Sequence, residues 1–217
     1  MQKYIFTLII ILFSVSVFGQ KVSFSVVVDP QINWMGTDVK NVTTEGNQFG
    51  FNFGLVFDKF FTDNYAFSSG VFLWTTGGGL SFDDSTTISF RSGDEVVPPD
   101  SPVTYRLQYL TVPLALKLNS NQIGYFSFFA HLGINNHVTI KKSADVPDLN
   151  IERVGIPDEI NAFNMSYFIG GGMEYSLGGS TAILAGVYYT KGFLDVTVSK
   201  DYKATLGGIS LRVGVRF

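Results

Sequence analysis

Side chains along much of this chain alternate between apolar and polar with a period of two residues. In the last segment, Ile209, Leu211, Val213, Val215 and Phe217 alternate with Ser210, Arg212, Gly214 and Arg216. Because successive side chains of a strand point to opposite faces, this pattern predicts a strand with one apolar and one polar surface. After residue 20, no uniformly apolar stretch reaches the about 20 residues that a membrane-spanning helix needs. A chain of this kind can therefore cross a membrane only with strands.

Segments of this kind recur from end to end, and each is near or above the about 9–11 residues of a tilted membrane-crossing strand. The fold class that they predict is all-β, an eight-stranded antiparallel up-and-down transmembrane β-barrel. Pro30 lies in the first segment and predicts a bulge or weak pairing there, because proline cannot donate to a ladder. The predicted strands are 23–34, 48–58, 65–76, 105–118, 125–139, 164–177, 181–193 and 204–217.

Short and long connections alternate strictly between these segments. The short ones are 59–64, 119–124 and 178–180, and the long ones are 35–47, 77–104, 140–163 and 194–203. In an up-and-down barrel this alternation places every short turn at one rim and every long loop at the other. Outer-membrane barrels have short periplasmic turns and long extracellular loops, so we expect both termini on the periplasmic side.

The first residues have the features of an export signal. Lys3 precedes the apolar run 4–18, and the small residue Gly19 offers a cleavage point before Gln20. We therefore expect a signal peptide over 1–19 and an outer membrane β-barrel domain over 20–217. An uncleaved N-terminal anchor is the alternative, although the run is short for a spanning helix. The chain has no cysteine, which excludes a lipidated N-terminus and a disulfide framework.

Composition separates a membrane barrel from a soluble one. Charged residues make up 15% of the chain, against about 25% in soluble domains. The chain also contains 21 Phe and 23 Gly. A secreted soluble barrel or sandwich, with its Phe-rich faces inward, would be left with a surface poor in charge. The composition thus favours the cell outer membrane. With a net charge of −3 and no clustered basic segment, no nucleic acid partner is expected.

One segment resembles a known family. Tyr109-Leu110-Thr111-Val112-Pro113-Leu114, in a strand that ends at Lys117, resembles a motif of the PorT-like outer membrane β-barrel proteins of the Bacteroidetes type. The end of the export signal, Phe18-Gly19-Gln20, and the strand 170–175 are similar to that family as well. The resemblance implies an outer-membrane barrel, and the family's named member is tied to protein secretion and gliding. It implies no catalytic residues.

The inward faces of the predicted strands carry both acids and bases. An eight-stranded barrel is just wide enough inside to be filled by side chains. Because buried charge persists only when it is paired, we expect a structural plug of ion pairs, with Glu174 and Arg212 as the first expected pair. A selective conduit or small-ligand site is the alternative. The predicted polar plug consists of Asp58, Lys117, His131, Glu174, Arg212 and Arg216, with Tyr109 beside them.

Evidence for catalysis or cofactor binding is weak. His131 faces inward and His137 lies near the top of the fifth strand, with Ser166 and Ser210 on other inward faces. No acid lies at a sequence spacing from either histidine that would indicate a catalytic arrangement, so no catalytic residue and no cofactor is predicted. A serine and an acid beside His137 in space would favour a lipid-modifying enzyme, and an open lumen would favour a channel.

The long connection 77–104 is acidic. It carries Asp83, Asp84, Asp94, Glu95 and Asp100 against Arg91 alone. This spacing matches no Ca²⁺ loop, so a solvated loop is favoured over a cation site and no metal ligand is predicted. The proline-rich stretch 97–102 predicts an extended, irregular segment that could serve as a partner-binding tip.

Aromatic residues near the strand ends fit the interface girdles of a membrane barrel, although strands favour aromatics anyway. They are Trp34, Trp74, Tyr105, Tyr125, Tyr175 and Phe217.

The sequence therefore predicts a non-enzymatic outer-membrane barrel with a structural or interaction role in the cell envelope. The family resemblance adds an accessory role in protein secretion. Expected partners are outer-membrane lipid, envelope or secretion-complex proteins, and the barrel-assembly machinery, which would recognise the terminal Phe217. A lipid-modifying enzyme, a narrow channel and a soluble ligand-binding barrel are the alternatives.

Overall fold

The computed structural model describes residues 21–199 and 202–217, and almost all of its regular structure is β-strand. Within these residues no helix has the length and apolar character needed to cross a membrane. The expected signal peptide and its cleavage point lie outside the described residues. The elements are β1 (Val22–Gly36), β2 (Val42–Glu45), β3 (Gln48–Phe60), β4 (Tyr65–Phe82), β5 (Thr86–Phe90), β6 (Gly93–Val97), β7 (Val103–Asn119), β8 (Phe126–Val146), η1 (Pro147–Leu149), β9 (Ile151–Gly155), β10 (Phe163–Gly178), β11 (Thr181–Gly192) and β12 (Thr205–Arg216).

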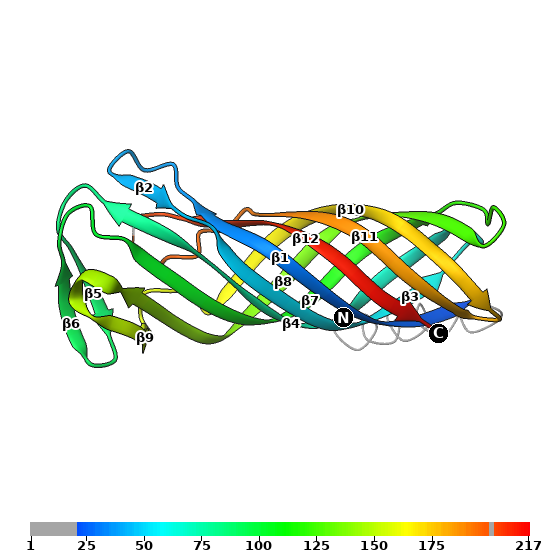
Figure 1. The fold of residues 1–217 in the computed structure, drawn as a ribbon, viewed down its shortest axis with the longest axis horizontal. Helices are drawn as coiled ribbons and strands as arrows, with labels where there is room; N and C mark the ends of the chain where they lie inside the picture. Colours follow the sequence, from blue (N-terminus) through cyan, green and yellow to red (C-terminus); the bar gives the residue numbers. More distant parts are fainter. Residues whose placement is uncertain (1–20, 200–201) are drawn as a thin grey trace, which may run out of the picture.

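Eight of the strands in the described part of the chain close into an antiparallel barrel. Their order is β10-β11-β12-β1-β3-β4-β7-β8, and the pairing of β8 with β10 closes the ring. All eight strands predicted from the alternation are thus confirmed. Closure leaves no unpaired edge in the barrel wall. Figure 1 shows the strands winding around one long axis, with β2, β5, β6 and β9 gathered at one end.

Pro30 weakens the pairing of β1 without adding a bulge. It lies opposite Phe51 of β3. On the other side, the pairs of β1 with β12 stop at Val28 and resume at Gln31 in the same register. The missing amide of proline explains the interruption. A bulge occurs instead between β7 and β8, at Gln108 and Tyr109.

The outward faces of the barrel strands form an apolar belt. Alternate residues of each strand are exposed and apolar, as in Phe49, Phe51, Phe53 and Leu55 of β3. The belt continues around the ring, at every second position, through Leu110–Leu118 on β7 and Ile209–Val213 on β12. An exposed apolar surface of this extent is suited to hydrocarbon rather than to water.

The two ends of the barrel differ as predicted. One end, here the turn end, carries the short links between β3 and β4, β7 and β8, and β10 and β11. The other, the loop end, carries the long connections. These are more ordered than the sequence indicated, because β4 runs on to Phe82, β7 begins at Val103 and β8 continues to Val146. Strand β2 pairs with the extension of β4, and β9 with that of β8.

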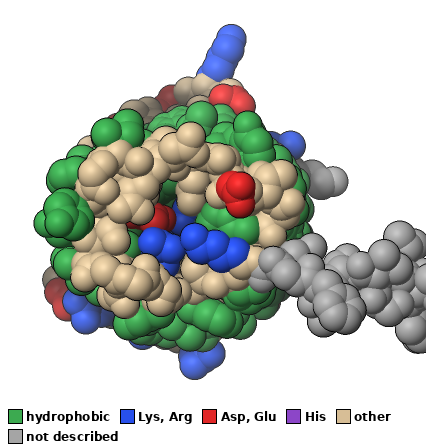
Figure 2. Space-filling model, turned by 90° about the vertical axis from the view of Figure 1, so that its right-hand side faces the viewer, with side chains coloured by type: hydrophobic (Ala, Val, Ile, Leu, Met, Phe, Trp, Pro, Cys, Tyr) green, Lys and Arg blue, Asp and Glu red, His purple; other side chains and the backbone are tan. Residues whose placement is uncertain are grey.

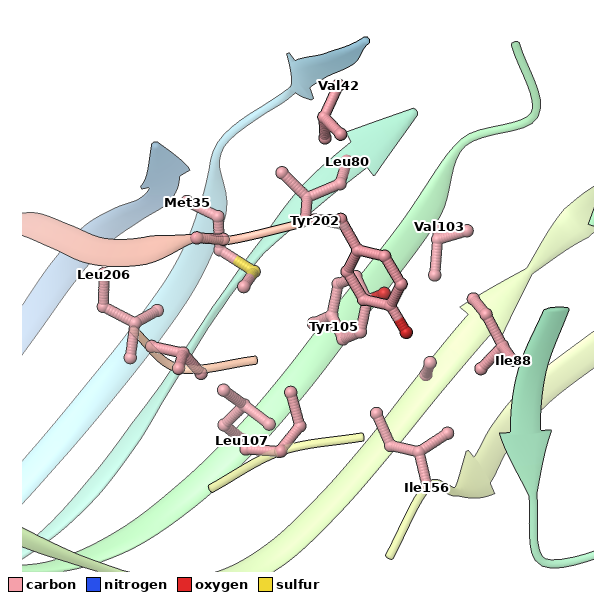
Figure 3. Packing of buried hydrophobic residues seen from close by; sticks show 14 of the residues in the cluster. Met35, Val42, Leu80, Ile88, Val103, Tyr105, Leu107, Ile156, Tyr202 and Leu206 are labelled. Carbon is pink, nitrogen blue, oxygen red and sulfur yellow. The ribbon is translucent and has the colours of Figure 1, made fainter. Parts of the chain in front are cut away.

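The loop-end elements enclose a hydrophobic core of their own, and we call this assembly the cap. It consists of β2, β5, β6, β9, η1, the extensions of β4, β7 and β8, the segment 156–162, and residues 193–199 and 202–204. Figure 3 shows its side chains pointing toward one another from these separate elements. The cap core consists of Met35, Val42, Trp74, Leu80, Phe82, Ile88, Phe90, Val97, Val103, Tyr105, Leu107, Tyr109, Ala144, Val146, Ile156, Ile160, Val196, Tyr202, Ala204 and Leu206.

Candidate functional site

A four-residue ion network crosses the lumen toward the turn end. Lys117 Nζ donates to Asp58 Oδ2 and to Glu174 Oε1, each at 2.8 Å. Arg216 Nε lies 2.9 Å from Glu174 Oε2, an ion pair without hydrogen-bond geometry. Ser68 Oγ donates to the other oxygen of Asp58 at 2.6 Å. Figure 2, a view onto the turn end, shows charged side chains gathered in the mouth and hydrophobic ones around the perimeter.

A second ion pair lies deeper in the lumen. Arg212 Nε and Nη2 donate to the two oxygens of Asp29 at 2.9 and 2.7 Å. The guanidinium lies over the Tyr188 ring, with its central carbon 4.1 Å from the ring centroid. Bidentate geometry of this kind is the strongest form of arginine–carboxylate contact. Asp29 and Arg212 cancel in charge, as do the two acids and two bases of the first network.

The structure places all six residues of the predicted plug inside the barrel, but the expected pairing of Glu174 with Arg212 is wrong. Glu174 contacts Lys117 and Arg216, whereas Arg212 pairs with Asp29. Asp29 was missed in the sequence. Its period-two relation to Gln31 and Asn33, both buried, was the signal that it points inward.

An aromatic layer packs around the charges. His131 Nδ1 lies 2.7 Å from the Tyr188 hydroxyl, which anchors that ring. The ring rests against Gly170, where an added Cβ would lie 2.2 Å from Tyr188 Cδ1. Phe72 covers Gly54 in the same way, also at 2.2 Å. Glycine at these two inward positions thus makes room for rings that fill the lumen.

Only small cavities remain between these layers in the described part of the chain. One of about 50 Å³ lies between the Asp29–Arg212 pair and Trp74, and one of about 10 Å³ lies beside Lys117. One water molecule needs roughly 10–15 Å³ of such volume, so the larger cavity holds about three to five water molecules. The lumen as described is therefore filled by side chains, and the cap core covers its loop end.

His137 and Ser166 form a buried hydrogen-bonded pair near the cap. His137 Nε2 lies 2.9 Å from Ser166 Oγ, and its Nδ1 lies 2.8 Å from Thr111 Oγ1. The ring packs on Trp74 with 4.1 Å between centroids. The serine that would favour an enzyme is present, but a threonine hydroxyl occupies the place of the acid. His137 is 1% exposed, so a substrate could not reach it without opening the cap.

Two of the six expected girdle aromatics are wrong. Trp74 and Tyr105 are buried among cap and lumen side chains instead of facing outward. Tyr125, Tyr175 and Phe217 are exposed. The aromatic enrichment of strands hid the distinction, because the inward faces near the cap are as apolar as the outward ones.

The acidic connection 77–104 is largely folded into the cap. The β5–β6 hairpin lies within it, and Arg91 N at the turn donates to Gly155 O at 2.8 Å. In the described residues, no group of three or more acids, histidines or cysteines is arranged to hold a metal ion. The stretch 98–102 is irregular as expected, but buried Val97 and Ser101 anchor it to the cap. Pro98, Pro99, Asp100 and Pro102 are exposed around these anchors, so a partner contact at this stretch stays a prediction.

Comparison with models of known protein families identifies the family of this chain. A family model described as outer membrane protein beta-barrel domain matches residues 13–198. The chain belongs to this family. Its barrel accordingly lies in the outer membrane. Since outer-membrane barrels have short periplasmic turns and long extracellular loops, we expect the turn end toward the periplasm and the cap outside. This match shows the outer membrane barrel family, and it does not distinguish the PorT-like proteins within it.

Solved outer-membrane barrels resemble the chain at low identity. OprG from Pseudomonas aeruginosa has 11% identity and a TM-score of 0.48, with 91% of this chain and 94% of that one covered. The neisserial surface protein NspA has 12% identity and a TM-score of 0.49, with 90% and 97% covered. A search of curated protein sequences found no match.

Proposed function

We propose that this protein is a closed outer-membrane barrel that acts as a structural and interaction component of the cell envelope, with the cap as its contact surface. The observation that carries the proposal is the filled lumen. Two charge-balanced ion groups, an aromatic layer and the cap core follow one another along its axis. A barrel built to conduct would need a continuous polar path instead.

The resemblance to PorT-like barrels extends this proposal to an accessory role in protein secretion. The ordered cap supports it, because a folded extracellular surface can present a fixed face to another envelope protein. On its surface, Val96 of β6 is a large apolar side chain that is 61% exposed. Neighbouring Asp94 and Glu95 are exposed as well, which makes this hairpin edge a candidate contact.

A lipid-modifying enzyme is the second candidate, and the pair of His137 and Ser166 is the observation that favours it. The missing acid and the burial of both side chains weigh against it. Substituting Ser166 by Ala should leave the envelope lipids unchanged by mass spectrometry. A changed lipid profile would make the enzyme the leading reading.

Deletion of the gene with complementation tests the interaction role. The wild type should restore secreted-protein levels and envelope integrity, while a variant with residues 84–97 replaced by a Gly-Ser linker should not. Heat-modifiable migration on a detergent gel verifies that both barrels are folded in the outer membrane. Full restoration by the linker variant would refute the role of the hairpin, and steady single-channel currents from the wild type would refute the closed barrel.

A further inference from the structure

On one side of the barrel, the apolar belt ends abruptly toward the loop end, and the next outward-facing side chains include basic ones. Leu110 on β7 and Ile140 on β8 are the last exposed apolar residues of the belt on these two strands. The next outward positions toward the cap are Gln108 and Arg106 on β7, and exposed Lys141 follows Ile140 on β8. The β-bulge between β7 and β8 lies at this border. Positive charge therefore begins at the height where hydrocarbon ends.

Two adjoining grooves lie on the cap side of this border. One of about 330 Å³ lies between β8, β9 and the β5–β6 turn, and the other, of about 210 Å³, lies over β7 and β8. They share Lys141, Ser143 and Arg153. Among the described residues that line them, no side chain is acidic, although the cap as a whole is rich in acids. The basic residues of the two grooves are Arg91, Arg106, Lys141, Lys142 and Arg153.

Asp145 orients two of the arginines from beside the grooves. Its Oδ2 accepts from Arg106 Nε and its Oδ1 from the Arg153 backbone amide, both at 2.6 Å. Arg153 adopts a φ of 50°, the left-handed region. Residues other than glycine rarely adopt this conformation, and the hydrogen bond from the Arg153 amide to Asp145 stabilises it here. The arrangement directs the Arg153 side chain into both grooves.

Lys142 builds the wall of the larger groove. Its Nζ donates to the carbonyl oxygens of Pro157 and Ile160, at 2.8 and 2.5 Å. The other four basic side chains remain exposed at the rim. Arginine guanidinium groups suit phosphate oxygens because they can donate two parallel hydrogen bonds.

We propose that these grooves bind the phosphate of a phosphorylated lipid in the outer leaflet, with its acyl chains lying on Leu110, Val138 and Ile140. Charge complementarity selects an anion, and continuity with the belt selects an anion that carries hydrocarbon. A soluble anion would gain nothing from the exposed apolar side chains directly beneath the grooves. This proposal does not rest on the contact role proposed for the cap, although Arg91 of the larger groove lies in the hairpin whose replacement tests that role.

Binding of purified lipid A to the full protein in neutral detergent tests the proposal. The probes are lipid A with its phosphates, the same lipid after phosphate removal, and inorganic phosphate. The variant is K141Q with R153Q, and its control is K191Q with K203Q, which removes two cations elsewhere on the loop side. Heat-modifiable migration on a gel verifies that each variant is folded.

The wild type and the control should bind phosphorylated lipid A with affinities within about twofold of each other. The K141Q/R153Q variant should bind at least about tenfold more weakly, because each cation near a lipid surface contributes on the order of a few-fold in affinity. Added salt should reduce the difference by screening. Equal binding by the two variants would overturn the proposal. So would equal binding of the dephosphorylated lipid, or inorganic phosphate that competes at the concentration of the lipid.

Discussion

Replacing Lys117 by Met should destabilise the barrel strongly, because it removes the cation that two buried carboxylates share. The lysine side chain is 3% exposed, and those of Asp58 and Glu174 are 1% and 3% exposed. Breaking a buried ion pair by removing one partner costs about 3–5 kcal/mol. Ser68 still donates to Asp58, and Arg216 still faces Glu174, so the expected loss lies at the lower end, about 3 kcal/mol.

A second substitution tests whether the loss of stability in K117M comes from uncompensated negative charge. Changing Asp58 to Asn in the K117M background removes the uncompensated charge and retains a polar partner for Ser68. The double variant should therefore be more stable than K117M alone, by about 1–2 kcal/mol. The exposed pair of Lys203 and Asp195, at 3.6 Å, supplies the control. Its loss should cost about 0–1 kcal/mol.

The assay is urea unfolding in lipid vesicles, followed by tryptophan fluorescence and by the mobility shift on unheated gels. A loss in K117M no larger than in K203M would show that Lys117 does not neutralise the two carboxylates. A double variant whose loss equals the sum of the two single losses would refute the shared-charge argument. Unchanged midpoints in all variants would mean that the lumen network contributes nothing to stability.

Three further predictions concern the aromatic layer, the cap and the terminal strand. Gly170→Ala should lower the unfolding midpoint, at a cost of about 1–3 kcal/mol, because the new methyl displaces the Tyr188 ring. The control is Gly36→Ala, whose new methyl comes within 3.4 Å only of the flexible end of the Lys191 side chain and should not lower the midpoint. Equal effects of the two substitutions would contradict the packing argument. Burial raises the pKa of Tyr105 in the cap well above its usual value, so the stability linked to its neutral phenol is complete below about pH 10 and is lost as the pH rises further. Tyr105→Phe should therefore reduce cap proteolysis above that pH, and a variant as sensitive as the wild type would count against this cause. Deleting Phe217 should lower the amount of heat-modifiable barrel in the outer membrane, if the assembly machinery recognises this residue; unchanged yield in a membrane-fraction immunoblot would remove it from that role.

The barrel itself could be predicted from the sequence because one rule governs it. Lipid outside and a packed polar lumen inside force every wall strand to alternate, and the alternation from Ile209 to Phe217 expresses that rule directly. The alternation of short and long connections then set the topology and orientation. The same rule placed Lys117, Glu174 and Arg212 inside, since a charge on the outward face would meet hydrocarbon.

Which inward charges meet was decided only by the tertiary structure. Pairing across a lumen depends on strand tilt and on the register around the ring, and the period-two pattern of a single strand determines neither. Glu174 therefore meets Lys117 of β7 and Arg216 of β12, while Arg212 meets Asp29 of β1.

The cap was invisible in the sequence for a related reason. Beyond the belt the outer faces of β4, β7 and β8 meet water or other loop segments, so the alternation that marks a lipid-facing strand fades. Its core joins Met35, Ile88, Ile156 and Tyr202 from four separate connections, each too short to show a pattern alone. The sequence by itself determined the barrel wall, because lipid imposes one repeating constraint on every strand. Only the folded chain decided how the lumen is paired and how the cap is closed, because both depend on contacts between distant segments.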